Sequence, residues 1–570
     1  MYSEVKTKHG DCDFDAIVIG AGSAGLYQLH RLRELGLKVR LLESGTGVGG
    51  VWYWNRYPGA RFDSESYSYA YFFSHELLRD WKWSEHFAAQ PETEQYFNFV
   101  ADKFDLRRDI SFSSTVVSAR YREDCCSWVL TLQDGKELSC HYVVAAVGPL
   151  THPTLPAYEG VSSFAGEAYH TARWPKEPVD FEGKRVAVIG TGASGVQTIQ
   201  EVSKTAKQLT VFQRTANYCV PLGNSKIASE EQQRIIDDYP RIYRRCFETM
   251  GGFIHNIDPR SAFDLSPEER EAFWEKLYNQ PGLGMWLGNF HDCFVNEEAN
   301  RLVSEFVAGK IRQRVKDPKV AERLIPKNHG FGTRRVPLET NYYELFNRPT
   351  VHLVDLTETP IVRVMPTGIE TSDGFFELDM IIYATGFDAL TGSFDKIHVE
   401  GVGGKTLKDK WADGAETFLG LTASGFPNFF MPGGPMSWLG NIPRGLEYGV
   451  DWIAGLIKFM EDNGIDAVDA KAQSEQEWTT FSSEGAQKFL SAKVDSWFTG
   501  VNTNVSGKSK RTYPFYRGGG PAYRQRAEQV VREGYAKDFN LIERPAASGT
   551  ESGRQDTAPF EEPARKAMAG

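Results

Sequence analysis

The sequence predicts an α/β fold, because two glycine-rich turns each join a short apolar run to a helical pattern. GAGSAG (Gly20–Gly25) ends the run DAIVIG, and GTGASG (Gly190–Gly195) ends the run RVAVIG. Short apolar runs that end in glycine are typical of buried parallel strands. Between about residues 225 and 330 the sequence predicts helices, and from Ile235 to Met250 apolar residues recur at steps of three and four. We therefore expect two Rossmann-like dinucleotide-binding domains with a helical insertion.

The elements of the two units are expected in the same order. In the first unit, a strand at residues 15–20 leads through a helix, which Gly36 ends, to a strand at residues 38–43. In the second unit, a strand at residues 185–190 and a helix precede a strand at residues 208–214. Each unit therefore begins as a βαβ motif.

Further elements follow in the second half of the chain. The segments VHLVDL (Val351–Leu356) and DMIIYATGFDA (Asp379–Ala389) predict strands. In the insertion, Ser266-Pro267-Glu268-Glu269 has the pattern of a capping box with proline at the first helical position. Pro240 is expected to kink the helix that contains it.

Composition and charge limit the class of protein. A chain of 570 residues exceeds what one hydrophobic core usually supports, and a net charge of -11 argues against a nucleic-acid binder. The N-terminus lacks the apolar core of a signal peptide, and no run of apolar residues could span a membrane. The cysteines are scattered without a CxxC pair. We expect a cytoplasmic monomer or small homo-oligomer without membrane, metal or nucleic-acid binding.

The two glycine turns favour different nucleotides. Glu43 ends the second strand of the first unit, where a carboxylate accepts hydrogen bonds from ribose hydroxyls and repels a 2′-phosphate, so this unit suits FAD or NAD. The second unit has Arg214 and Thr215 at that place, and a guanidinium pairs with the 2′-phosphate of NADPH. The glycines that admit the pyrophosphates are Gly20, Gly22, Gly25, Gly190, Gly192 and Gly195. Such a chain passes hydride from NADPH to a flavin.

Two longer motifs carry a resemblance to a known family. The segment after Glu43 is similar to [A/G]GxWxxxx[F/Y]P[G/M]xxxD, through Gly49, Gly50, Trp52, Tyr57, Pro58, Gly59 and Asp63. The segment FAGEAYHTARWP is similar to FxGxxxHxxxW[P/D], through Phe164, Gly166, His170, Trp174 and Pro175. Both are motifs of the type I Baeyer–Villiger monooxygenases. The resemblance runs from about residue 14 to 540, and within the family the chain looks closest to the phenylacetone and steroid monooxygenase branch.

The resemblance implies an enzyme that uses FAD, NADPH and O2 to convert a ketone into an ester or lactone. It implies an FAD domain at residues 1–149 and 387–541 and an NADP domain at residues 150–224 and 333–386, with the insertion at residues 225–332. The composition of residues 542–570 predicts a disordered tail.

The resemblance also implies the catalytic residues. Arg335 of GFGTRR matches the active-site arginine, Asp63 matches the acid that holds it near the flavin, and Arg334 matches a basic position that helps bind the 2′-phosphate. Chemistry supports an arginine here. The flavin C4a-peroxide must stay an anion to attack the carbonyl and form a tetrahedral adduct, and a permanent cation stabilises this charge without protonating it.

Further residues match positions near the cofactors or substrate. The expected cofactor contacts are Ser23, Gly50, Val51, Trp52, Trp54, Tyr69 and Val116 for FAD, and Ala193, Ser194, Gln197 and Trp497 for NADP. The segment FMPGGPMSWLGNIP occupies the place of the substrate loop, with Met436, Trp438 and Leu439 as expected pocket residues. It departs from the pattern of the branch at Pro432, Trp438 and Pro443, so the substrate of relatives is not carried over.

Two alternative functions stay open, and His170 has a separate interpretation. A flavin monooxygenase that oxygenates nitrogen or sulfur shares both glycine turns, but normally carries Tyr or Phe at the position of Trp174 and lacks the pair of Arg335 and Asp63. A non-catalytic nucleotide-binding regulator needs no basic residue beside the flavin. We interpret His170 as an inter-domain hydrogen-bonding residue that couples NADP binding to the flavin site.

Overall fold

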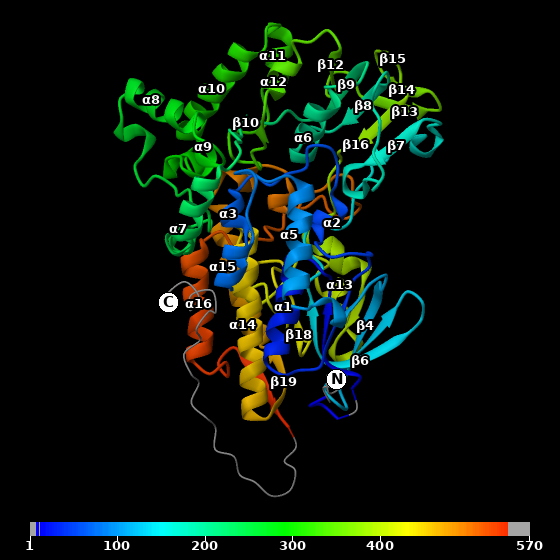
Figure 1. Ribbon diagram of the computed structural model, residues 1–570, viewed down its shortest axis with the longest axis vertical. Coiled ribbons are helices and arrows are strands. Elements are labelled where there is room, and N and C mark those ends of the chain that lie inside the picture. Colours follow the sequence, from blue (N-terminus) through cyan, green and yellow to red (C-terminus); the bar gives the residue numbers. More distant parts are fainter. Residues whose placement is uncertain (1–6, 11, 545–570) are drawn as a thin grey trace, which may run out of the picture.

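The computed structural model describes residues 7–10 and 12–544 and arranges them in two α/β parts (Figure 1). One part contains the first glycine turn together with the C-terminal helices, and the other contains the second glycine turn and most of the insertion. No helix of the described residues is both long and apolar enough to cross a membrane.

The first part is built on a large mixed sheet with the order β17-β4-β5-β6-β1-β2-β3, with β18 paired to β6. The central strand β1 is parallel to both β2 and β6, and Val18 lies opposite Leu41 and Val144. These three side chains are fully buried, which explains the apolar run before the first glycine turn. The strands are β1 (Phe14–Ile19), β2 (Val39–Leu42), β3 (Ile110–Ser111), β4 (Val116–Arg122), β5 (Ser127–Leu132), β6 (Glu137–Ala145), β17 (His398–Glu400) and β18 (Phe429–Phe430).

Helices from both ends of the chain cover this sheet. The helix α1, which follows the first glycine turn, packs against α14 from the C-terminal half (Figure 1). Tyr27 and Arg31 of α1 both donate hydrogen bonds of 2.8 Å to Asp451 of α14, which fixes the two helices together. The main helices of this part are α1 (Ser23–Glu34), α5 (Gln90–Lys103), α14 (Ile442–Asn463), α15 (Ala472–Gln487) and α16 (Gly520–Arg532).

The second part contains a sheet with the order β12-β9-β8-β16-β7, in which all pairs are parallel. The helix α6 (Ala193–Val202) follows β8 after the second glycine turn. The strands are β7 (Glu167–His170), β8 (Arg185–Ile189), β9 (Gln208–Gln213), β12 (Val351–Asp355) and β16 (Met380–Tyr383), and a separate antiparallel sheet holds β13 (Ile361–Met365), β14 (Gly368–Thr371) and β15 (Gly374–Glu377). The predicted strands of both βαβ motifs are thus confirmed, as are the strands near residues 351 and 380.

Residues 225–332 are mainly helical, as predicted. Ser266 Oγ accepts a hydrogen bond from the backbone of Glu269, whose carboxylate accepts one from the backbone of Ser266, so the predicted capping box is confirmed. Pro240 lies inside α7, which continues through it. The helices are α7 (Ser229–Glu248), α8 (Pro267–Tyr278), α9 (Gly284–Leu287), α10 (Glu297–Arg314) and α11 (Pro318–Leu324). The domain boundaries themselves stay a prediction.

The prediction of a tail from residue 542 is wrong at its start. Strand β20 (Phe539–Glu543) pairs with β19 (Ile465–Ala470), and Ile542 lies opposite Ala467. Composition could not reveal this, because the strand is stabilised by a partner that is distant in sequence. The rest of the predicted tail, residues 545–570, lies outside the described residues.

Candidate active site

A cavity of about 1430 Å³ lies between the two parts and is lined by both glycine turns. Each turn stands at the carboxyl end of a parallel strand, where open α/β sheets bind their ligands. The predicted site residues that line it are Gly20, Gly22, Ser23, Glu43, Gly50, Val51, Trp52, Trp54, Asp63, Tyr69, Val116, Gly190, Gly192, Ala193, Ser194, Arg214, Thr215, Arg334, Arg335, Leu439 and Trp497.

The first glycine turn is shaped to receive a nucleotide. A Cβ on Gly25 would lie 1.8 Å from the carbonyl oxygen of Gly20, so glycine is required for the close packing of helix on strand. A Cβ on Gly50 would lie 2.7 Å from Cα of Gly22, so the motif at residues 49–63, here called the flavin-side motif, packs directly on this turn. Glu43 is buried, and its carboxylate accepts hydrogen bonds of 2.7 Å from the backbone of Ala21 and of Gly45. These bonds hold the carboxylate at the cavity wall.

The second glycine turn has the same close packing of helix on strand, but the space beside Gly192 is open. A Cβ on Gly195 would lie 2.1 Å from the carbonyl oxygen of Gly190, whereas a Cβ on Gly192 would meet no atom within 4 Å. The space before the N-terminus of α6 is therefore free for a pyrophosphate. Gly25 and Gly195 do not line the cavity, because they face their own strands.

Two arginines of the second part approach each other at the cavity. Burial lowers the pKa of Arg334 and the positive charge of Arg214 lowers it further, whereas the negative charge of Asp495 raises it. Arg214 donates to the hydroxyl of Thr503 at 2.9 Å and Arg334 to the backbone oxygen of Asp495 at 2.6 Å, but neither forms an ion pair with a carboxylate of the described residues. Such a cationic pair is stabilised by an anion between its members, which fits the 2′-phosphate of NADPH.

Arg335 and Asp63 meet at the cavity wall. A guanidinium nitrogen of Arg335 donates a hydrogen bond of 2.5 Å to Oδ2 of Asp63. Burial raises the pKa of Asp63, whereas Arg335 and Arg61 lower it. Nη1 of Arg335 and Oδ1 of Asp63 are buried without a hydrogen-bond partner. The side chain of Arg335 as a whole is 35% exposed, so another part of it remains accessible to a ligand in the cavity.

Besides Gly25 and Gly195, three further predicted contacts lie outside the cavity lining. Gln197 hydrogen-bonds the hydroxyl of Tyr57 at 2.8 Å and the backbone of Arg61 at 3.0 Å, so it joins the flavin-side motif to α6. Met436 and Trp438 are buried, and the indole of Trp438 donates to the backbone of Met250 at 3.0 Å. The prediction of these two as pocket residues is corrected, because the loop turns their side chains into the core and leaves Leu439 at the cavity.

The FxGxxxHxxxW[P/D] motif at residues 164–175, here called the second fingerprint, lies beside the cavity, and its fixed positions are not part of the wall. Nδ1 of His170 accepts a hydrogen bond from the backbone of Ala172, and Nε2 lies 3.3 Å from both the carbonyl of Thr154 and the hydroxyl of Thr385. Burial lowers the pKa of His170 to about 4. The neutral ring thus links Thr154 and Ala172 to Thr385, which lines the cavity.

The other fingerprint residues serve packing and close approach. A Cβ on Gly166 would lie 2.5 Å from the backbone oxygen of Asp379. Phe164 packs against the core of the second sheet, and Trp174 is buried between Tyr169 and Phe181. Pro175 follows Trp174 directly. These residues therefore stabilise the second sheet and do not line the cavity.

Several cavity residues were not found from the sequence. Arg173 lies inside the second fingerprint, and its guanidinium stacks 4.7 Å from the ring of Trp54 in the flavin-side motif. Lys396, Asp495 and Arg517 also line the cavity. The sequence offered a signal for Arg173 alone, since it lies within the second fingerprint. The other three residues lie in segments without a recognised motif.

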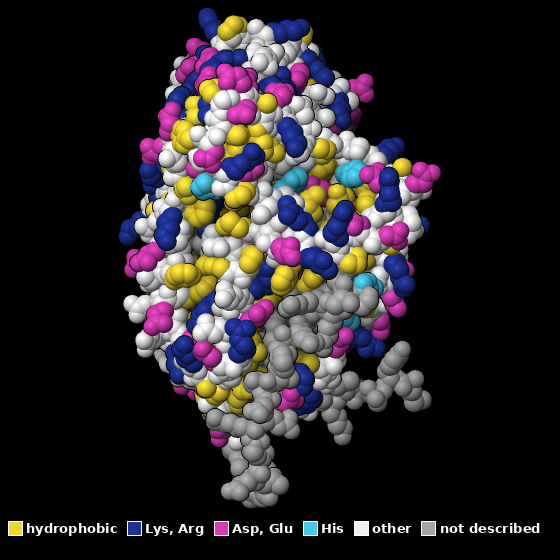
Figure 2. Space-filling model, turned by 90° about the vertical axis from the view of Figure 1, so that its left-hand side faces the viewer, with side chains coloured by type: hydrophobic (Ala, Val, Ile, Leu, Met, Phe, Trp, Pro, Cys, Tyr) yellow, Lys and Arg dark blue, Asp and Glu magenta, His cyan; other side chains and the backbone are white. Residues whose placement is uncertain are grey.

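The wall of the cavity carries more basic than acidic side chains. Figure 2 shows acidic and basic side chains intermixed over one face. The basic residues of the wall are Arg61, Arg173, Arg214, Arg334, Arg335, Lys396 and Arg517, and the acidic residues are Glu43, Asp63 and Asp495. Despite the net charge of -11, the cavity is therefore suited to anionic ligands.

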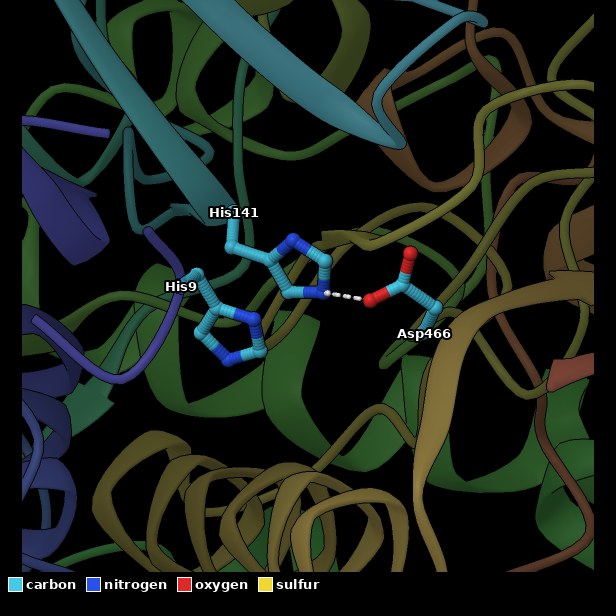
Figure 3. Close-up of side chains that lie close together, drawn as sticks. All are labelled: His9, His141 and Asp466. Atoms are coloured by element: carbon cyan, nitrogen blue, oxygen red, sulfur yellow. Dashed lines mark ion pairs between the residues drawn. The ribbon is translucent and has the colours of Figure 1, made fainter. Parts of the chain in front are cut away.

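A cluster of His9, His141 and Asp466 lies away from this cavity and brings three possible metal ligands within 4.8 Å (Figure 3). The two rings stack with centroids 3.7 Å apart and planes within 8°. A metal ion is bound in the plane of an imidazole, so parallel stacked rings are poorly placed to share one. Nε2 of His9 is 2.8 Å from Glu461, and Arg544 contacts Asp466 at 3.3 Å. The cluster joins the N-terminal segment to α14 and the segment after β20.

Comparisons with known proteins agree with this site. The family model "Flavin-binding monooxygenase-like" matches residues 15–225. The chain is 46% identical over 529 residues to the "2-oxo-Delta(3)-4,5,5-trimethylcyclopentenylacetyl-CoA monooxygenase" of Pseudomonas putida, covering 91% of this chain and 97% of the relative. It is 42% identical over 531 residues to the "Acetone monooxygenase (methyl acetate-forming)" of Gordonia sp. (strain TY-5), covering 92% of this chain and 99% of the relative.

Solved structures give the same result. The structure of the OTEMO complex with FAD and NADP has a TM-score of 0.90 and 45% identity, and covers 94% of this chain and 100% of the matched chain. Oxidized steroid monooxygenase bound to NADP has a TM-score of 0.88 and 43% identity, and covers 93% of this chain and 99% of the matched chain. The chain therefore belongs to the Baeyer–Villiger monooxygenases of the flavin-binding monooxygenase family, which use FAD, NADPH and O2 to convert ketones into esters or lactones.

Proposed function

We propose that Arg335, held by Asp63, is the catalytic cation with which this enzyme oxygenates a small-molecule ketone. The observation that carries this proposal is the 2.5 Å hydrogen bond between the two side chains at the wall of the cavity. Part of the Arg335 side chain stays exposed at the cavity, which supports a role toward a bound ligand.

The cofactor contacts are proposed on the same geometry. Glu43 accepts hydrogen bonds from the ribose of FAD, and the N-termini of α1 and α6 face the two pyrophosphates. Arg214 and Arg334 bind the 2′-phosphate of NADPH, which relieves the repulsion between them. Reduced FAD, when bound, supplies the activated oxygen for the reaction.

The chain contributes charge stabilisation and positioning to the reaction. Arg335 stabilises, as a cation, the negative charge that develops on the carbonyl oxygen of the ketone. Asp63 orients the guanidinium of Arg335, because the buried carboxylate of Asp63 pairs with it. His170 holds Thr385 and Thr154 in place and so positions the NADP side of the cavity relative to the flavin side.

One experiment tests this function against the alternative of nitrogen or sulfur oxygenation. The purified yellow protein is supplied with NADPH and a panel of ketones, sulfides and amines, and the products are identified by mass. We expect esters or lactones from ketones. An Arg335→Ala variant should still reduce FAD with NADPH and form no ester. Ester formation that persists in this variant, or products from sulfides and amines alone, contradicts the proposal.

The oligomeric state and the compartment are further proposals. We propose a monomer or small homo-oligomer in the cytoplasm, a compartment for which cysteines at scattered positions without a CxxC pair are typical. Light scattering after size-exclusion chromatography measures the mass, and a species larger than a tetramer contradicts this assignment.

A further inference from the structure

Arg517 is a cation of the cavity wall without a counter-charge among the described residues. Its guanidinium stacks on two rings that also line the cavity, 4.5 Å from the centroid of Phe489 and 5.4 Å from that of Phe498. One of its nitrogens donates a hydrogen bond to Oγ of Ser491, which is neutral and buried. No carboxylate of the described residues forms an ion pair with Arg517, and burial lowers its pKa to about 10.

A cation in this position is costly unless an anion joins it. Burial of an unpaired charge is unfavourable, and stacking on aromatic rings offsets only part of that cost. The part of Arg517 that is not buried faces the cavity, since the residue lines it. An anionic ligand group would therefore be stabilised at this place.

The location of Arg517 assigns this anion to the substrate rather than to the nucleotides. Arg517 follows Tyr516, whose backbone oxygen accepts a hydrogen bond of 3.2 Å from Leu439, the cavity residue of the substrate loop. Pro514 accepts one of 2.9 Å from Met436 in the same loop. The 2′-phosphate of NADPH has its own cationic pair at Arg214 and Arg334, so Arg517 is left for another ligand.

We propose that Arg517 binds a carboxylate of the substrate, so that the preferred ketones of this enzyme are oxo acids. The aromatic rings of Phe489 and Phe498 would pack against the carbon chain near that carboxylate. The carbonyl would lie near Arg335, and the chain length between the two groups would set which oxo acid fits. This inference rests on the proposed function, since it names the substrate class of the same cavity.

The test compares acids with neutral esters of the same carbon skeleton. The substrates are the oxo acids from 4-oxopentanoate to 8-oxononanoate and their methyl esters, with the enzyme, Arg517→Met and Arg517→Lys. For the best acid, we expect a kcat/KM at least tenfold above that of its ester. Arg517→Met should remove this preference by raising KM for the acid about tenfold or more, with the esters and the KM for NADPH unchanged. Arg517→Lys should retain part of the preference.

A second measurement uses the unaltered holoenzyme and needs no turnover. The flavin absorbance is titrated with hexanoate to nonanoate and with the matching carboxamides, and the carboxylates should bind at least tenfold more tightly. Equal binding of carboxylates and carboxamides overturns the proposal, even if the Arg517→Met variant fails to fold.

The outcomes separate this inference from the proposed function. Efficient conversion of esters without any preference for acids overturns the role of Arg517 and leaves the proposed function intact. A KM for NADPH that rises in Arg517→Met assigns Arg517 to a cofactor phosphate and overturns the inference. An equal loss for acids and esters shows a structural role and also overturns it. If no ketone is converted, the proposed function fails, and the titration still decides whether Arg517 selects carboxylates.

Discussion

Arg335 donates a hydrogen bond of 2.5 Å to Asp63 across 272 positions of the sequence, and the carboxylate of this pair is almost fully buried. The two residues come from segments that are far apart in the chain and meet only at the cavity. Their contact links the flavin-side motif to the loop that carries both arginines of GFGTRR.

Asp63→Asn should lower ester formation by about 100-fold or more, because a neutral amide no longer holds the guanidinium in its catalytic orientation. The rate of anaerobic FAD reduction by NADPH should change by less than about threefold, which stopped-flow absorbance measures. Glu65→Gln is a matched control, since Glu65 is also a buried carboxylate with its own partner, His255 at 2.8 Å. Equal losses in both variants would contradict a specific role for Asp63.

Arg214→Ala should weaken the preference for NADPH over NADH. A charge-assisted hydrogen bond to the 2′-phosphate is worth about 1.5–3 kcal/mol, so KM for NADPH should rise about tenfold or more while KM for NADH stays nearly constant. Steady-state kinetics with both nucleotides measure this. Arg363→Ala serves as the control, because Arg363 pairs with Glu370 on the separate antiparallel sheet. Parallel changes for NADPH and NADH would show that Arg214 does not contact the 2′-phosphate.

His170→Ala should retain FAD but release more hydrogen peroxide per NADPH oxidised. Loss of the imidazole frees Thr385 and Thr154, so the NADP side of the cavity is less well positioned against the flavin side. The ratio of ester to peroxide measures this coupling. His170→Asn should restore part of it, because an amide oxygen can accept the hydrogen bond from Ala172. An unchanged ratio in His170→Ala would refute the positioning role.

His141 should make the protein less stable as the pH falls below 6.5. Burial lowers the pKa of His141 to about 3, with further lowering by His9, so the unfolded chain binds a proton that the folded chain excludes between pH 6.5 and 3. The resulting decrease in the free energy of unfolding is absent above pH 6.5 and reaches about 2 kcal/mol at pH 5.

Thermal unfolding of His141→Gln at several pH values tests this. The decrease in Tm between pH 7 and pH 5 should be smaller in His141→Gln than in the unaltered protein. The exposed His352 provides the control, and His352→Gln should leave the pH dependence as it was. A decrease of the same size in both variants would show that His141 does not cause the acid sensitivity.

Local sequence determined much of the fold and of the nucleotide sites. The buried strands before Gly20 and Gly190 form as their apolar runs predict, because such runs are stable only between covered faces. Glu43 and Arg214 lie at the cavity as the βαβ pattern requires, since strand and turn fix where a strand end points. The patterns that predict these features lie within segments of a few tens of residues, although β1 also pairs with the distant β6 and β8 with the distant β16.

Only the tertiary structure decided what irregular segments do. The substrate loop turns Trp438 into the core, because its indole finds a partner in Met250 from the insertion, and Ile542 joins a strand whose partner lies far away in sequence. Arg517 has no motif, and its missing counter-charge is visible only once every carboxylate of the described residues has a position. Contacts between segments that are far apart in the sequence decide these three features. They set the direction of side chains in a loop, the pairing of distant strands and the absence of an ion pair.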